Sequence, residues 1–273
     1  MYERIVKDIK NKKTLSGIND SIVEKELDKL FLTEPKLRSR IDSPRSKNYK
    51  SIIKKVREKL HKTYGMFQLN TDRDKLLQKL NKNNVKEICS EVLKTHLSTK
   101  ERLPYYSELY SDIFKITKKP KSILDLGCGL NPFSIPWMGL KNIKYIATDI
   151  SKEDLNFINK FFKIIKIDGK VKELDLVKIK KENVLKQFPK VNICFLFKVF
   201  ESIELTKGHK LSELIIINVK ANFVIVSFPT KTLLNKPMKM TKRPWLERML
   251  KRLNYNYEIY ETGNEIYYIV TKH

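Results

Sequence analysis

The stretch Ser122–Gly139, SILDLGCGLNPFSIPWMG, has the pattern of a buried strand that breaks into a glycine turn and then opens a helix. Its first five residues form a short, mostly apolar run that contains Asp125. Gly127 and Gly129 permit a tight turn and a close approach of the backbone to a ligand. The dipeptide Asn131-Pro132 predicts a helix start, with a capping side chain followed by a favourable first-turn proline. The stretch therefore predicts a strand, a ligand-binding turn and a helix.

Two further apolar runs are followed by acids. Residues 143–148 lead into Asp149, about twenty residues after the glycines, where a carboxylate can accept both hydroxyls of a ribose. The segment VKELDL then supplies Asp175. A glycine needed only for a steric turn is the alternative, but the spaced acids favour a nucleoside pocket. The third glycine of the dinucleotide pattern is replaced by Pro132, which disfavours a pyrophosphate. S-adenosylmethionine, which has no phosphate, fits Gly127, Gly129, Asp149 and Asp175.

The order of elements predicts an α/β fold. Strands are expected near 122–126, 143–148, 171–174, 191–197 and 223–227, with helices between them. Two β-rich runs, 257–260 and 266–270, flank the turn Thr262-Gly263-Asn264 and predict a closing hairpin. This layout is expected of a class I S-adenosylmethionine-dependent methyltransferase, with a Rossmann-like, mostly parallel seven-stranded sheet. Residues 1–95 show helical periodicity instead, so we expect a helical N-terminal domain and a methyltransferase domain over 96–273.

The charge indicates a polyanionic partner. The formal net charge is +25 over 273 residues, and nucleic acid is the first candidate. A lysine-rich genome is the alternative, yet basic residues cluster between Lys231 and Arg252 and around Ser43-Pro44, where a loop is expected. A solvated charged loop remains the other interpretation for each single residue. The candidate RNA-binding residues are Lys36, Arg38, Arg40, Arg45, Lys47, Lys231, Lys236, Lys239, Lys242 and Arg243.

The cysteines and apolar runs bear on compartment. Cys89, Cys128 and Cys194 share no metal-ligand spacing, so no metal site is expected. No signal peptide or apolar run of membrane-spanning length is evident, which predicts a cytoplasmic protein without a membrane partner. Cys128 is most simply a small residue packed in the glycine turn, and Cys194 is expected in the core.

Four segments, in order, resemble one family. HLSTKERLPYYSELYSDIF, LDLGCGLNP, LFKVFESIE and VSFPTKTL look like the FmrO/Arm-type 16S rRNA guanine-N7 methyltransferases known for aminoglycoside resistance, over about residues 95–272. The resemblance implies S-adenosylmethionine as cofactor and 16S rRNA of the 30S subunit, at its decoding region, as substrate. It also implies that the helical region docks on the ribosome. We expect a monomer.

The resemblance also implies residue roles. His96 and the STKER segment would line the cofactor pocket, with the Arg102 fork on the methionine carboxylate. Without the resemblance, a phosphate contact or a surface pair would be preferred for His96 and Arg102, and a core position for Phe197. The implied cofactor contacts are His96, Arg102, Gly127, Cys128, Gly129, Asp149, Ile150, Asp175, Leu176 and Phe197, and the implied catalytic residues, beside the methyl group and the base, are Phe197 and Lys198.

The implied chemistry needs little acid–base catalysis. Guanine N7 has a free lone pair and no proton to lose, so positioning should dominate. Residues 197–200 are Phe-Lys-Val-Phe, where purine-amine methylases carry an Asn/Asp-Pro-Pro-aromatic motif, and this disfavours N6-adenine methylation. Glu201 or Glu204 could stabilise positive charge, or both are ordinary helix-start acids. Another RNA such as tRNA, a catalytically idle RNA-binding fold and a small-molecule substrate remain alternatives.

Overall fold

The chain forms two compact units. The computed structural model describes residues 2–12, 15, 20–41, 43–60, 73–179, 183–204, 208–232 and 236–272. One unit comprises Met1–Asp72 with Lys94–Ser98, and the other comprises Arg73–Leu93 with Thr99–His273. We expected the boundary at residue 95. Arg73–Leu93 instead belongs to the larger unit, because buried side chains such as Cys89 and Val92 pack into that unit's core.

The smaller unit is helical in its described part, as its periodicity predicts. Val6, Ile9, Leu27, Ile52 and Val56 are all buried and form its apolar interior. The Tyr49 hydroxyl donates a hydrogen bond to Asp8 at 2.7 Å, and the Tyr2 hydroxyl donates one to Asp28 at 2.8 Å. The elements are α1 (Glu3–Lys10), α2 (Asp20–Thr33), the 3-10 helix η2 (Pro35–Arg40) and α3 (Lys47–Leu60).

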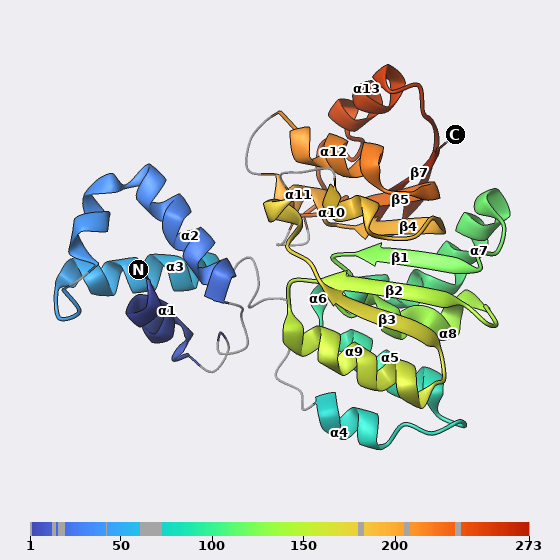
Figure 1. Cartoon of the computed structure of the whole chain (residues 1–273), viewed down its shortest axis with the longest axis horizontal. Coiled ribbons are helices and arrows are strands. Elements are labelled where there is room, and N and C mark those ends of the chain that lie inside the picture. The colour runs from blue at the N-terminus through green and yellow to red at the C-terminus, as the bar shows by residue number, and fades with distance from the viewer. Residues whose placement is uncertain are drawn as a thin grey trace. The chain divides into compact units, whose positions relative to one another are not determined.

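The larger unit is built on one seven-stranded sheet (Figure 1). The strands are β1 (Ser122–Leu126), β2 (Lys144–Asp149), β3 (Asp168–Glu173), β4 (Val191–Phe197), β5 (Ala221–Pro229), β6 (Asn256–Thr262) and β7 (Glu265–Thr271). Their order is β3-β2-β1-β4-β5-β7-β6. Pairing is parallel from β3 to β5 and antiparallel at β5–β7 and β7–β6. The predicted mostly parallel sheet and closing hairpin are confirmed.

Successive side chains of a strand point to opposite faces of the sheet, so apolar strands present an apolar surface on each face. Helices cover both of these surfaces. One core contains Ile123, Ile193 and Ile225, and the other contains Leu124 and Cys194. Side chains of α5, α7, α8 and α9 pack on the first core, and those of α11, α12 and α13 pack on the second. The helices are α4 (Arg73–Gln78), α5 (Val85–Lys94), α6 (Leu97–Arg102), α7 (Tyr106–Thr117), α8 (Ile135–Met138), α9 (Lys152–Ile164), α10 (Asn183–Lys186), α11 (Phe200–Ile203), α12 (Lys210–Asn218) and α13 (Pro244–Arg252), with the 3-10 helices η4 (Leu103–Tyr105), η5 (Asn131–Ser134) and η6 (Leu176–Lys178).

Two local predictions need correction. Asn131 does not cap a helix: η5 begins at Asn131 itself, Leu130 is its N-cap residue, and the Asn131 amide turns inward to Asp125. The third strand lies at 168–173 rather than 171–174, and Asp175 follows it as the capping residue of η6. Asn131 turns inward because its amide reaches the buried Asp125 carboxylate, and β3 begins earlier than predicted because Asp168 already pairs with Lys144 of β2. No described helix is long and apolar enough to cross a membrane.

Candidate active site

The carboxyl ends of β1, β2, β3 and β4 meet at one edge of the sheet, where the glycine turn lies. Gly127 and Gly129 have φ values of 66° and 49°, which favour glycine. A Cβ built on Gly127 would stand 3.0 Å from Val199 Cγ2 and 3.7 Å from Leu176 Cδ1. The turn therefore lies against the segments that follow β3 and β4. This is the edge at which open parallel sheets bind ligands.

Asp149 is fixed against the glycine turn. Its Oδ2 accepts a hydrogen bond from Gly129 N at 2.8 Å, and its Oδ1 accepts one from Ser151 N at 3.0 Å. Burial and the nearby Asp154 carboxylate raise the pKa of Asp149, against these hydrogen bonds. The structure thus brings together the glycines and the acid predicted to hold the ribose. The ribose contact itself stays a prediction.

Asp175 lies beside the same turn. Leu174 N donates to the carbonyl oxygen of Asp149 at 2.9 Å, which aligns the chain after β3 with the end of β2. Asp175 Oδ1 accepts from Val177 N at 3.0 Å, so one oxygen caps η6. Leu176 is buried, and Ile150, directly after Asp149, is half-buried. The predicted adenine-side residues are therefore adjacent to the turn.

Cys128 is a packed residue. Its thiol is buried, and its pKa lies well above the ordinary value because of burial and the nearby Asp125 carboxylate. Its backbone N–H donates to the carbonyl oxygen of Thr148 at 2.9 Å, joining β1 to β2 beyond the last paired residues. A neutral, enclosed thiol has no nucleophilic use.

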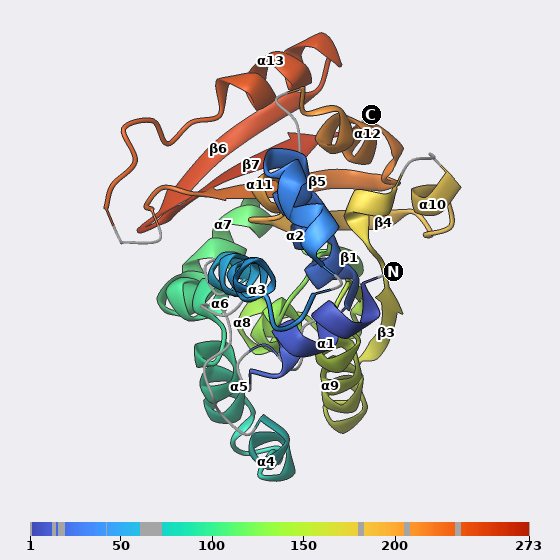
Figure 2. The ribbon, with the colours of Figure 1, turned by 90° about the vertical axis from the view of Figure 1, so that its left-hand side faces the viewer.

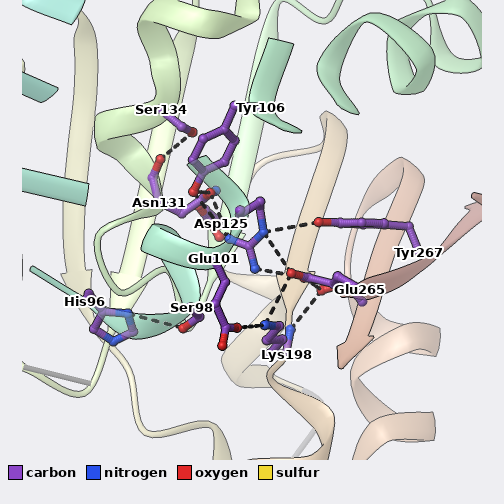
Figure 3. Close-up of polar contacts among 12 residues, drawn as sticks. His96, Ser98, Glu101, Tyr106, Asp125, Asn131, Ser134, Lys198, Glu265 and Tyr267 are labelled. Carbon is purple, nitrogen blue, oxygen red and sulfur yellow. Dashed lines mark hydrogen bonds and ion pairs between the residues drawn. The ribbon is translucent and has the colours of Figure 1, made fainter. Parts of the chain in front are cut away.

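Arg102, on α6, lies in a buried ion pair with Glu265, whose carboxylate is labelled in Figure 3. Its Nη2 donates to Glu265 Oε1 at 2.8 Å and its Nε donates to Glu265 Oε2 at 3.2 Å. Burial lowers the pKa of the Arg102 guanidinium, but the Glu265 carboxylate more than reverses this. Glu265 therefore occupies the Arg102 fork in this structure, and the predicted contact of Arg102 with the methionine carboxylate stays a prediction. Nη1 has only longer contacts, 3.4 Å to the Tyr106 hydroxyl and 3.5 Å to Asn131 Oδ1.

Glu265 connects Arg102 to the end of β4. It is fully buried at the start of β7 and also accepts from the Ser227 hydroxyl. Lys198 Nζ lies 3.5 Å from Glu265 Oε2 and 2.8 Å from Glu101 Oε2. Burial raises the pKa of Glu265, but the cations Arg102 and Lys198 together hold it below its usual value. The group is therefore ionised and shared between two cations.

Phe197 and Lys198 end β4 at this network. The Phe197 ring is buried, and the Arg102 guanidinium carbon lies 4.7 Å from the ring centroid. Lys198 has a φ of 57°, and its backbone N–H donates to the Ser227 hydroxyl at 3.0 Å. A strained non-glycine backbone held by several partners is typical of functional positions. Their contact with a methyl group or a base stays a prediction.

A second set of buried polar side chains, centred on Asp125 and Asn131, lies next to this ion-pair network (Figure 3). Asn131 Nδ2 donates to Asp125 Oδ2 at 2.9 Å, and the Tyr145 hydroxyl donates to the same oxygen at 2.6 Å. Burial raises the pKa of Asp125 to about 6, although both hydrogen bonds oppose this. Sequence reasoning missed Glu265 and the inward use of Asn131. The one available signal was an acid that opens the otherwise apolar run EIYYIV.

His96 belongs to the smaller unit by its contacts, and its Nδ1 lies 3.2 Å from Ser98 Oγ. Its predicted place at the cofactor stays a prediction. Glu201 and Glu204 have protein partners: Glu201 pairs with Arg243 at 2.7 Å, and Glu204 accepts from Ser212 N at 2.7 Å. These contacts favour structural roles for both acids.

The basic candidates divide by exposure. Arg243 is wrong as an RNA contact, because it is 8% exposed and its guanidinium is held by Glu201, the carbonyl oxygen of Pro229 and the Phe228 ring. Lys36 and Arg38 lie on η2 rather than in a loop, and Lys47 begins α3. The Arg40 side chain lies outside the described part. Of the other RNA-binding candidates, Lys231 is half-buried. The exposed candidates are Lys36, Arg38, Arg45, Lys47, Lys236, Lys239 and Lys242.

The family model "Ribosomal RNA methyltransferase (FmrO)" matches residues 40–269. The chain belongs to this family. It is 27% identical, over 81% of its length and 82% of the relative's, to the 16S rRNA (guanine(1405)-N(7))-methyltransferase of Micromonospora echinospora. It is 28% identical to the enzyme of the same name from Proteus mirabilis, over 82% of this chain and 85% of that one.

Solved structures agree on the fold. The 16S rRNA methylase ArmA shares 27% identity and a TM-score of 0.57, covering 75% of this chain and all of that one. The 16S rRNA methyltransferase RmtF, solved with S-adenosyl-L-homocysteine, has a TM-score of 0.72 at 22% identity, over 100% of this chain and 98% of that one. The predicted FmrO family and class I methyltransferase fold are confirmed.

This FmrO-family chain is thus an S-adenosylmethionine-dependent RNA methyltransferase, as predicted. Its own residues fit that cofactor. The backbone of the turn at Gly127 and Gly129 lies next to the carboxylate of Asp149, which is held by Gly129 N. The third glycine of the phosphate-binding pattern is replaced by Pro132. The family confirms the cofactor, while the individual contacts remain for experiment.

Proposed function

We propose that this enzyme methylates N7 of a guanine in the decoding region of 16S rRNA within the 30S subunit. The observation that carries the proposal is its similarity, over four-fifths of its length, to enzymes named for that reaction in both Micromonospora and Proteus. We further propose that it works as a monomer in the cytoplasm, where 30S subunits are found. The helical smaller unit, with its exposed cations, would then dock on rRNA phosphates.

Positioning carries the chemistry in this proposal. When bound, the cofactor would supply a methyl group on its sulfonium sulfur; the lone pair of N7 would form the new bond, the sulfur would keep the electrons of the broken bond and leave as S-adenosyl-L-homocysteine, and no proton would be lost. The chain's own residues bind and orient: Gly127 and Gly129 give backbone room, Asp149 holds the ribose, and Asp175 with Leu176 frames the adenine. Phe197 and Lys198 flank the reacting atoms at the end of β4. Such orientation can lower a barrier by about 7–11 kcal/mol without a general base.

The state of Lys198 supports this assignment. Its side-chain nitrogen is paired with Glu101 and Glu265, at 2.8 Å and 3.5 Å, so the protein's own acids already hold it at the end of β4. A base is not needed at N7, whereas methylation of an exocyclic amine must release a proton. The proposed reaction at a ring nitrogen therefore asks of Lys198 only a positioning role.

The test is methyl transfer from labelled S-adenosylmethionine to 30S subunits, naked 16S rRNA and tRNA, followed by mapping of the labelled nucleotide. We expect label on a guanine N7 of the 30S subunit, and none with the Asp149→Ala variant. Label on tRNA alone would overturn the substrate, and cofactor binding without transfer to any of the three would indicate an idle RNA-binding fold.

A further inference from the structure

Helix α13 presents a basic face to solvent. Leu246, Met249 and Leu250 are buried against the sheet, which leaves Arg248 and Lys251, three residues apart, exposed on the other side. Figure 2 shows α13 lying over β6 at one end of the sheet. Both cations of this face are exposed in the part of the unit that the structure describes.

A groove of about 480 Å³ opens beside these cations, where α13 ends and β6 begins. It combines two cations, two side-chain amides and two aromatic rings: Arg248, Lys251, Asn254, Asn256, Tyr255 and Tyr257. The acid at its wall, Glu247, accepts a hydrogen bond from the Tyr268 hydroxyl at 2.9 Å. Cations and amides of this kind are the usual donors to phosphate and sugar oxygens of RNA.

The ion pairs of this region set Arg248 and Lys251 apart. Arg243 is paired with Glu201 and Arg252 with Glu213, each at 2.7 Å. Arg248 and Lys251 have no ion-pair partner in the described part of the chain. Unpaired cations that line a concave polar surface are available for an external anion.

The groove is remote from the candidate active site but connected to it by α13. Strand β5 ends at Pro229 on the edge that carries the glycine turn, and β6 runs in the same direction as β5 because each is antiparallel to β7. Strand β6 therefore begins at Asn256 on the opposite edge. Exposed Lys239 and Lys242 precede α13 at the first edge, so cations follow the helix from the site towards the groove.

We infer that this groove binds the sugar–phosphate backbone of the rRNA substrate at a second place, away from the target base. Arg248 and Lys251 contact phosphates, and the Asn254 and Asn256 amides bond to phosphate or ribose oxygens. The inference rests on the proposed rRNA substrate and adds a contact surface to it. Such contacts orient the enzyme on the subunit without reading sequence.

The first test compares two double variants of the full chain. Arg248→Gln/Lys251→Gln removes both groove cations, and Lys141→Gln/Lys163→Gln removes two exposed lysines elsewhere in the larger unit. Binding to 30S subunits is measured across salt concentrations with S-adenosyl-L-homocysteine present. We expect the groove variant to bind about tenfold more weakly at low salt, with a salt slope shallower by about 1.4–1.8. A slope equal to that of the control variant overturns the inference.

A second measurement locates the contact. Cys89, Cys128 and Cys194 are buried, so a thiol introduced by Lys251→Cys can carry a tethered RNA-cleaving iron chelate selectively. We expect discrete cleavage of 16S rRNA from Lys251→Cys and none from Lys141→Cys. Wild-type methylation of 30S subunits is measured alongside. Its absence overturns the proposed function and this inference together, whereas normal methylation without a slope change or cleavage overturns the groove alone.

Discussion

The Glu265→Gln variant tests the buried ion-pair network most directly. Glu265 and Arg102 are 0% and 2% exposed, and the carboxylate also serves Ser227 and Lys198. Removing one partner of a buried pair typically costs 3–5 kcal/mol, because the other charge is left uncompensated. Glutamine keeps the shape and one acceptor oxygen, so we expect a loss of about 3 kcal/mol in the free energy of unfolding. For a unit of this size that lowers Tm by roughly 6–12 °C.

The pH dependence gives the prediction a sign. The pKa of Glu265 is lowered in the folded chain from an ordinary 4.5, so its ionised form stabilises the fold. That contribution is complete above the ordinary pKa and is lost as the pH falls through the folded pKa. The difference in stability between wild type and Glu265→Gln should therefore be full at pH 7 and shrink below about pH 4.5.

Urea and thermal unfolding at pH 7 and pH 4 provide the assay. Glu261→Gln, which changes an exposed acid on the neighbouring strand β6, is the matched control and should shift stability by less than about 0.5 kcal/mol. Arg102→Met/Glu265→Gln should be less destabilised than the sum of its single variants. Equal stability of Glu265→Gln and the control, or strict additivity in that cycle, would refute the shared-carboxylate reasoning.

Three further predictions concern the site and its rim. Asp149→Ala should abolish cofactor binding in calorimetry yet leave 30S binding intact; unchanged cofactor affinity would sink the ribose assignment. Lys239→Gln/Lys242→Gln should flatten the salt slope of 30S binding, whereas Arg243→Gln should mainly lower Tm because its guanidinium is internal. Asp125→Asn should exceed wild type in stability at pH 7.5 by up to about 3 kcal/mol, because the raised pKa of about 6 makes ionisation unfavourable, and the gap should close towards pH 4.

The sequence predicted the elements and the glycine turn well because each is encoded locally. The run SILDL pairs as β1, and the acid about twenty residues beyond the glycines lies against Gly129 as the spacing requires. The hairpin around Gly263 also follows from neighbouring residues. Periodicity and turn chemistry operate over a few residues, and one sequence is enough to detect them.

Partners distant in the chain could not be predicted in the same way. Arg102 and Glu265 are separated by 163 positions, and no local pattern links them. The same holds for Arg243, which has the sequence context of an RNA-contacting cation but reaches Glu201 across 42 positions. The amino-acid composition gives the number of charged residues. Which of them form ion pairs with one another depends on the three-dimensional fold.

The shared carboxylate of Glu265 has a consequence for how this enzyme works. The family resemblance implies that Arg102 faces the cofactor and Lys198 the base, and both cations bind the same carboxylate in this structure. A negatively charged group that binds to Arg102 or to Lys198 competes with Glu265 for that cation. The Glu265 carboxylate can then pair more fully with the other cation. Because Nη1 is the loosely held donor of Arg102, an incoming carboxylate is met first by that single nitrogen, and by the fork only if Glu265 turns to Lys198. Occupation of the two sides should therefore be energetically coupled, and Glu265→Gln should weaken that coupling as well as the fold.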